Sequence, residues 1–205
     1  MAFYEEADYR RLVDGAAKAD QRAHIAVLLG GEAGLRGGEM TALEWTDIDF
    51  ERRLLHVHRA EWEGQIGTPK GGRSRTVEMS SALTTALKAH LHLKGPRVLY
   101  SDDGSPADRD ALASWIRRAE RRAGLPLTGK LHILRHTFCS RLAARGATAM
   151  EIKELAGHGD LTTTMRYMHL SPSAKREAIN SLDAPVPARL SGNSLAMGAK
   201  EAAQS

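Results

Sequence analysis

Six side chains that can bind phosphate or move a proton are spread along the sequence, with no paired carboxylates among them. They are two arginines, one lysine, two histidines and one tyrosine, at Arg36, Lys70, His132, Arg135, His158 and Tyr167. Cleavage of a phosphodiester builds negative charge on the non-bridging oxygens, and a planar guanidinium neutralises it by gripping two oxygens at once. A tyrosine hydroxyl can attack phosphorus and form a phosphotyrosine, while a lysine or histidine protonates the leaving 5′-oxygen. The set therefore fits covalent phosphoryl transfer.

Tyr167 has a sequence context that favours chemistry over packing. Its neighbours in LTTTMRYMHL include Thr164, Arg166 and His169 rather than a run of apolar side chains. The pKa of a free phenol is near 10, so a tyrosine nucleophile needs nearby cations or a histidine to help it lose its proton. We therefore expect a helix after Gly157-His158 that presents Tyr167 to a phosphate.

Two glycine-rich segments place the first basic residues of the set. Arg36 lies in GLRGGE, a turn that leads into a helix, where backbone N–H groups and a guanidinium can point at one anion. Lys70 lies in GQIGTPKGGRS, between β-like runs over 54–58 and 75–79. These runs predict a small antiparallel sheet with Lys70 in a long hairpin loop.

The segment LHILRHTF contains the next two candidate residues. His132 and Arg135 are three residues apart, so on a helix they share a face. That face lies away from an apolar stripe that includes Leu134 and Phe138, an arrangement that fits a cleft wall or an exposed helix side.

The remaining patterns predict a mainly α fold with a small antiparallel β-sheet, an α+β class. Expected helices cover 5–14, 20–30, 39–45, 81–91, 110–123, 131–145, 149–156, 161–170 and 173–182. The second is expected to stop at Gly30-Gly31, and Gly124, Gly146 and Gly157 are expected to end later helices. From 184 to 205 the chain is rich in small residues, Pro, Gly and Ser, which predicts a flexible tail.

Length, charge and cysteine content limit the class of protein. The chain has 205 residues, which suits one domain plus a tail, and its net charge of +4 mildly favours polyanionic partners. Eight Lys or Arg against one acid, Glu120, fall between Arg117 and Arg145, which is either a phosphate-binding patch or a solvated helix face. With one cysteine, no signal pattern and no apolar run near about 18 residues, we expect a soluble cytoplasmic protein.

Five motifs in order resemble those of the catalytic domain of tyrosine recombinases, the phage-integrase and Xer-type family. They are GLRGGE over 34–39, Lys70 followed by RTV over 75–77, HILRH over 132–136, LAGH over 155–158 and TMRYMH over 164–169. Any one of them occurs by chance, but five in this order and spacing are specific. The resemblance covers roughly residues 5–182.

The resemblance implies a role for each residue. Arg36 and Arg135 would hold the scissile phosphate, Tyr167 would be the nucleophile and Lys70 the general acid. His132 would assist proton transfer and His158 would hydrogen-bond the phosphate. Glu39 and His136 would support the site, and the reaction would need no metal, ATP or other cofactor.

The resemblance also implies partners and domains. The partner would be double-stranded DNA, bound by a homotetramer on two sites when the protein is full length, whereas this chain alone would be a monomer. The catalytic domain would cover 1–183 and the flexible tail 184–205. Family members usually carry an N-terminal core-binding domain, which we expect to be absent from this chain.

Three other readings remain open at this stage. A metalloenzyme is suggested by the nine histidines, but there is no H-E-x-x-H and no second cluster with ligand spacing. A type IB topoisomerase-like enzyme would use the same phosphotyrosine chemistry to nick and religate. A non-catalytic DNA-binding module would keep the fold without the chemistry.

Overall fold

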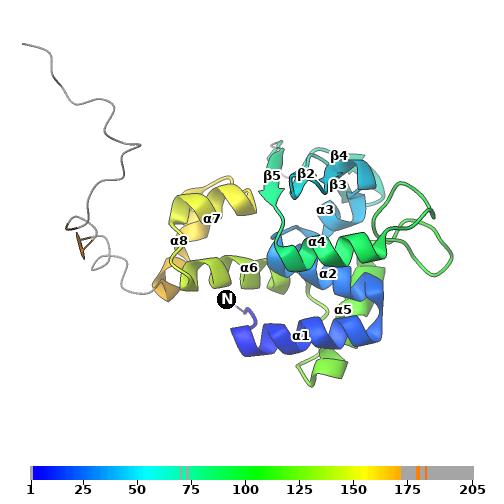
Figure 1. Ribbon diagram of the computed structural model, residues 1–205, viewed down its shortest axis with the longest axis horizontal. Helices are drawn as coiled ribbons and strands as arrows, with labels where there is room; N and C mark the ends of the chain where they lie inside the picture. Colours follow the sequence, from blue (N-terminus) through cyan, green and yellow to red (C-terminus); the bar gives the residue numbers. More distant parts are fainter. Residues whose placement is uncertain (1, 70, 73, 172–178, 181–182, 184–205) are drawn as a thin grey trace, which may run out of the picture. The chain divides into compact units, whose positions relative to one another are not determined.

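The computed structural model describes residues 2–69, 71–72, 74–171, 179–180 and 183. Helices dominate the described chain, with two small antiparallel sheets beside them (Figure 1). This confirms the expected fold class. The α-helices are α1 Glu6–Ala19, α2 Gln21–Glu32, α3 Gly37–Ala42, α4 Ser81–His90, α5 Arg109–Ala123, α6 Leu131–Ala144, α7 Ala149–Ala156 and α8 Leu161–Met165. Short 3₁₀ helices cover Trp45–Asp47 and Met168–Leu170, and the strands are β1 Ile48–Asp49, β2 Leu54–Val57, β3 Ala60–Trp62, β4 Gln65–Gly67 and β5 Arg75–Glu78.

Helix α2 forms the centre of the helical core. Its residues from Ile25 to Gly31 are all buried, and it contacts α1, α4, α5 and α6. A helix that is apolar on all sides has to be covered on all sides, and these four helices provide the cover. Because α6 packs directly on α2, the helix that carries His132 and Arg135 is fixed to the most buried element of the fold.

The predicted stop of the second helix at Gly30-Gly31 is wrong. Helix α2 continues to Glu32, and both glycines serve close packing. A Cβ on Gly30 would lie 2.5 Å from Cβ of Leu134, and one on Gly31 would lie 2.3 Å from the ring of Tyr9. The absent side chains let α6 and α1 approach the backbone of α2.

The first helix is also longer than predicted. It runs to Ala19 instead of residue 14, and Gly15 lies inside it. A Cβ on Gly15 would lie 2.8 Å from the carbonyl oxygen of Ala119 on α5. Tertiary packing of α1 on α5 therefore outweighs the low helix propensity of glycine.

Other predicted helix ends are confirmed by their caps. The Ser80 side chain accepts a hydrogen bond from the N–H of Leu83 at the start of α4. Gly124 and Gly157 adopt left-handed conformations, with φ of 65° and 66°, directly after α5 and α7. These caps satisfy backbone groups that a helix end leaves unpaired.

The predicted antiparallel sheet is present and has one further strand. The strand order is β1-β2-β5, and Leu55 lies opposite Val77 with both side chains buried. The hairpin β3–β4 was not predicted. It turns through Glu63 and Gly64, which both have positive φ, and glutamate is an unusual residue for that conformation.

The predicted helix over 161–170 is wrong as a single element. Helix α8 ends at Met165, and a separate 3₁₀ helix begins at Met168. Between them, the side chain of Tyr167 is buried in a small hydrophobic cluster with Phe138, Cys139, Ala143, Ile152 and Ala156. Most of the predicted helix over 173–182, and the predicted tail over 184–205, lie outside the described residues.

Candidate active site

Two arginines from distant parts of the chain each donate a hydrogen bond to the carbonyl oxygen of a glycine. Arg36 precedes α3, and its Nη2 donates to the carbonyl oxygen of Gly157 at 3.1 Å. Arg135 on α6 donates from Nη1 to the carbonyl oxygen of Gly34 at 2.6 Å. Arg135 is therefore bonded to the segment that carries Arg36, and Arg36 is bonded to the residue before His158.

Arg135 is a buried cation with one free donor. The residue is 4% exposed, and its Nη2 has no hydrogen-bond partner among the described residues. Burial, and then repulsion from Arg36 and Arg75, lower the pKa of Arg135 to about 10. A desolvated guanidinium with an unused N–H is a strong site for an anion, because burying an unpaired charge is costly.

Glu39 supplies the negative charge that holds the arginines in place. Its Oε1 lies 2.9 Å from Nη1 of Arg36, and its Oε2 accepts the backbone N–H of Arg36 at 2.9 Å. Burial favours the neutral acid, but the ion pair with Arg75 and the contacts with Arg36 outweigh it and lower the pKa of Glu39 to about 2. Glu39 is thus ionised in the folded domain.

Arg75 is a site residue that sequence reasoning missed. It was noted only as the start of a strand, yet it pairs with both oxygens of Glu39, at 3.0 and 2.8 Å. Its Nε donates to the carbonyl oxygen of Leu155, 3.2 Å away. A Cβ on Gly157 would lie 2.8 Å from Cδ of Arg75. Arg75 can therefore occupy this position only because residue 157, before His158, is a glycine.

Tyr167 is more buried than its sequence neighbours suggested. The interpretation that it lacks apolar packing is wrong, because the residue is 2% exposed and its partners come from α6 and α7 rather than from nearby sequence. Its hydroxyl lies 2.7 Å from Nδ1 of His136 and beside the thiol of Cys139. Burial, with the neighbouring Cys139, raises the pKa of the Tyr167 phenol.

His158 packs against the nucleophile candidate. Its ring is nearly parallel to that of Tyr167, with centroids 6.3 Å apart, and its Nδ1 lies 2.9 Å from Oγ1 of Thr164. Burial, and then Arg135 and Arg36, lower the pKa of His158 to about 4. The ring is therefore neutral near pH 7, and its partner fixes the orientation of its other nitrogen.

His132 and His136 lie one turn apart on α6 at different depths. His132 is exposed, whereas His136 is half-buried, and their ring centroids are 6.2 Å apart. Burial, and then His132 and Arg135, lower the pKa of His136. A neutral His136 can accept the phenol proton of Tyr167 in their hydrogen bond.

A cavity of about 1020 Å³ opens next to these groups. Arg36, His132 and His158 line it on one side, and residues of the β3–β4 hairpin line it on another. The described residues that flank Lys70 in the sequence and line the cavity are Thr68 and Gly71. Lys70 itself lies outside the described residues, so its role stays a prediction.

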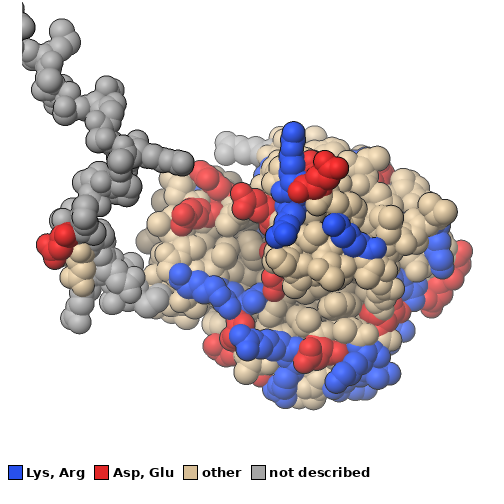
Figure 2. All heavy atoms as spheres, viewed as in Figure 1, with Lys and Arg blue, Asp and Glu red and all other residues tan. Residues whose placement is uncertain are grey.

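Of the eight basic residues between Arg117 and Arg145, three pair with described acids outside that segment, namely Arg118, Arg141 and Arg145. Arg141 lies 3.0 Å from Glu6 and 2.9 Å from Glu32, and Arg145 lies 2.9 Å from Glu6. The first of these acids belongs to α1, so counting charges within 117–145 could not find it. On the face in Figure 2, basic and acidic side chains lie side by side along the lower edge.

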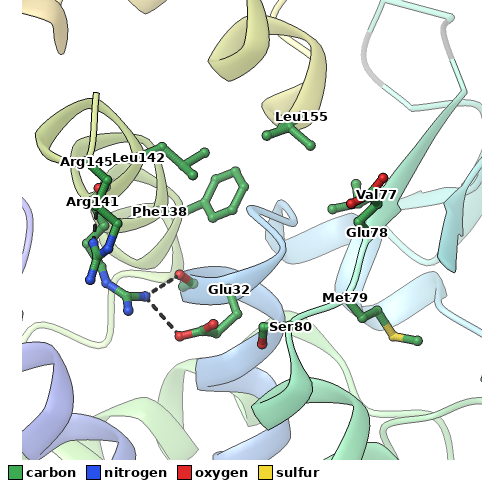
Figure 3. A pocket seen from close by; sticks show the side chains of 11 residues that line it. Glu32, Val77, Glu78, Met79, Ser80, Phe138, Arg141, Leu142, Arg145 and Leu155 are labelled. Carbon is green, nitrogen blue, oxygen red and sulfur yellow. Dashed lines mark hydrogen bonds and ion pairs between the residues drawn. The ribbon is translucent and has the colours of Figure 1, made fainter. Parts of the chain in front are cut away.

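Figure 3 shows Arg141 at the edge of a second cavity, of about 380 Å³, between α6, α7 and β5. Its guanidinium reaches Glu32 and the carbonyl oxygen of Gly31, while Phe138, Leu142 and Leu155 form the apolar wall. Arg141 is therefore a structural link between α6 and α2, and it is not available to a phosphate in this arrangement.

No described helix is long and apolar enough to cross a membrane. Nor do three or more described His, Cys, Asp or Glu side chains lie together in a group that could hold a metal ion.

Comparison with curated proteins identifies relatives of this chain. The sequence profile of the phage integrase family matches residues 2–174. A tyrosine recombinase XerC-like protein of Caldanaerobacter subterraneus is 32% identical over 193 residues, covering 79% of this chain and 49% of the relative. Tyrosine recombinase XerA of Pyrococcus furiosus is 29% identical over 180 residues, covering 85% and 59%. This chain thus spans about half the length of the curated relatives that it matches.

Solved structures share the fold. The catalytic domain of bacteriophage HP1 integrase has a TM-score of 0.67 and 25% identity, covering 91% of this chain and 99% of that one. The Tn1549 transposon integrase in complex with transposon right end DNA has a TM-score of 0.76 and 22% identity, covering 90% and 66%. The chain therefore belongs to the phage integrase family and has the fold of a tyrosine recombinase catalytic domain.

Proposed function

We propose that this chain is the catalytic domain of a site-specific recombinase or integrase. It cleaves and rejoins strands of double-stranded DNA through a covalent 3′-phosphotyrosine, without metal or ATP. The relatives named tyrosine recombinases and the neighbour solved with transposon DNA support this activity and this partner. When full length, the protein acts as a homotetramer on two DNA sites, in the cytoplasm.

The observation that carries the proposal is the imbalance of charge around Arg135. Three guanidinium groups lie near one carboxylate, that of Glu39. Arg36 and Arg75 form ion pairs with it, and Arg135 interacts with it electrostatically. The free Nη2 of Arg135 is buried, so it loses solvation without gaining a partner among the described residues. A phosphate diester carries one negative charge and oxygens at the right spacing for two guanidinium forks, which offsets that cost.

The residues then divide the reaction between them. Arg36 and Arg135 hold the non-bridging oxygens and stabilise the charge that grows there. The Tyr167 oxygen forms a bond to phosphorus as its proton leaves with the help of His132 and the nearby cations. The bond from phosphorus to the 5′-oxygen breaks, and Lys70 protonates that oxygen. The reverse attack by a 5′-hydroxyl restores Tyr167, so the bond energy is kept and no ATP is consumed.

The nucleophile has to be uncovered first. Tyr167 is almost fully buried and is not among the residues that line the large cavity. Its segment, with α8 and the following 3₁₀ helix, contacts the body of the domain through α6 and α7. We infer that DNA binding moves this segment so that the phenol reaches the phosphate held by the arginines.

The test is covalent trapping of the protein on DNA. A pool of end-labelled, nicked duplexes of randomised sequence is incubated with the protein in EDTA and without ATP, then separated on a denaturing gel. We expect a protein–DNA adduct that resists detergent and is removed by protease. Absence of any adduct from such a pool, with DNA binding intact by mobility shift, would favour the non-catalytic DNA-binding module.

A further inference from the structure

We propose that Trp62 and Arg109 together form a second DNA contact at the rim of the active-site cavity, which binds the strand beside the scissile phosphate. Trp62 packs on a sugar or base next to the cleavage site, and Arg109 binds the adjoining phosphate. This inference rests on the proposed function, and its test separates the two.

The pair combines an exposed aromatic ring with an exposed charge. Trp62 is 66% exposed at the end of β3, and Ile66, on the paired strand β4, is 47% exposed. The guanidinium carbon of Arg109, the first residue of α5, lies 5.7 Å from the centroid of the Trp62 ring. Both residues line the cavity that also holds Arg36, His132 and His158.

The fold brings this pair close to Arg36 by means of two glycines. A Cβ on Gly38 would lie 2.2 Å from the carbonyl oxygen of Glu61, so β3 packs directly on the backbone of α3. A Cβ on Gly37 would lie 3.4 Å from Nε of Arg109. Gly37 therefore lies beside Arg109, and Gly38 lies against Glu61, the residue before Trp62. Arg36, Trp62 and Arg109 line the same cavity, so a strand whose phosphate lies on Arg36 can reach this rim.

The chemistry of the pair suits a nucleic acid strand. Arg109 forms no ion pair with a described acid, so its charge remains available, and its contact with Trp62 restrains the guanidinium through a cation–π interaction. Exposed aromatic rings stack on bases with little sequence preference, and arginine binds phosphate through paired N–H groups. A tryptophan that served only packing would be buried, as Trp115 is, whereas Trp62 is exposed.

The experiment measures binding of a labelled, nicked duplex pool by fluorescence anisotropy at several salt concentrations. We expect Arg109→Ala to weaken binding and to lower the salt dependence by about one counterion, because one phosphate contact is lost. Trp62→Ala should weaken binding about five-fold or more with an unchanged salt dependence, since stacking releases no counterion. The double variant should lose less than the sum of the two, because the residues touch each other.

Intrinsic fluorescence provides a readout that a general loss of stability would not mimic. Trp62 is the exposed tryptophan, while Trp45 is half-buried and Trp115 is buried. Titration with DNA should quench the fluorescence of the wild type, and Trp62→Phe should remove most of this quenching while retaining most of the affinity. Arg109→Lys should restore part of the affinity lost in Arg109→Ala.

Matched controls come from exposed residues outside the cavity. Arg10 on α1 is a charge control, with a side chain that is 75% exposed, and Leu93 is a control for an exposed apolar side chain. If Arg109→Ala and Trp62→Ala match Arg10→Ala and Leu93→Ala while the wild type still forms its adduct, the rim contact is wrong and the proposed function stands. If the wild type neither binds the pool nor forms an adduct, both proposals fail.

Discussion

The hydroxyl of Tyr167 lies 2.7 Å from Nδ1 of His136, so the proposed nucleophile is held by a neighbouring helix in this structure. Both groups are neutral near pH 7, because burial raises the pKa of the phenol and lowers the pKa of the imidazole. The phenol therefore donates a hydrogen bond to the ring, and Tyr167 is almost fully shielded from solvent. We interpret this arrangement as a resting position of Tyr167.

His136→Ala tests that interpretation. Loss of one buried hydrogen bond should lower the free energy of unfolding by about 1–3 kcal/mol and leave Tyr167 easier to nitrate. Adduct formation should persist, since His136 holds the resting phenol and does not bind the phosphate. Nitration mapped by mass spectrometry, beside a denaturing gel, measures both effects. A loss of cleavage of about a hundred-fold or more would instead make His136 the general base.

Arg36→Ala and Arg135→Ala should each lower the cleavage rate by about 10²–10³, because each removes a donor to the charge that grows on phosphate. Arg135→Lys should recover little of that loss, since an ammonium cannot replace the guanidinium fork that spans Gly34 and the free Nη2 position. Single-turnover cleavage of a nicked duplex gives the rates. Arg145→Ala, which removes an exposed ion pair with Glu6, is the matched control and should cleave normally.

Glu39→Gln should destabilise the domain, by about 3–5 kcal/mol, because it leaves Arg75 buried without its counter-charge. A double variant, Glu39→Gln with Arg75→Met, should regain much of that stability but not cleavage, since Arg36 also loses its anchor. Denaturant unfolding of the wild type, both single variants and the double variant forms the cycle. Additive losses of stability would show that the pair is not coupled.

The neutral state of His158 predicts a dependence of stability on pH. Its pKa is about 4 in the folded domain, against about 6.5 for a free histidine. As pH falls from about 6.5 to 4, His158 becomes protonated in the unfolded state but stays neutral in the folded state. This difference lowers the free energy of unfolding by up to about 3 kcal/mol across that window. Above pH 6.5 it contributes nothing.

His158→Asn should therefore flatten the decline of stability between pH 6.5 and 4, measured by urea unfolding at a series of pH values. His56→Asn, an exposed histidine on β2, is the control. An unchanged slope in His158→Asn would contradict the inferred neutral state. Because a bound phosphate favours the charged imidazole, the pKa of His158 should also rise when DNA binds.

Local signals in the sequence were enough for much of the fold. Ser80 and Gly157 mark helix ends through caps that depend only on neighbouring residues, and the structure has them where the sequence places them. Gly30 and Gly31 mislead, because their function is contact with Leu134 and Tyr9, residues far away in sequence. A glycine that breaks a helix and a glycine that permits close packing look the same in one sequence.

The same limit applies to the site. The sequence motifs nominated Arg36, Arg135, His158 and Tyr167, and the structure places these residues close together. Arg75 was missed as a site residue because its partner, Glu39, lies on a different element. The packing of Tyr167 was also missed, since its neighbours come from α6 and α7. Partners that only tertiary contacts supply are not visible in local spacing.

The central claim is that Tyr167 forms the covalent bond to DNA, and mass spectrometry of the trapped adduct tests it most directly. Wild type and Tyr167→Phe are incubated with the same nicked duplex pool, and the adduct is digested to its cross-linked peptide. We predict a phosphodiester remnant on Tyr167 in the wild type, and no adduct from Tyr167→Phe although its DNA affinity is unchanged. An adduct that persists in Tyr167→Phe, or a remnant on any other residue, would contradict the account.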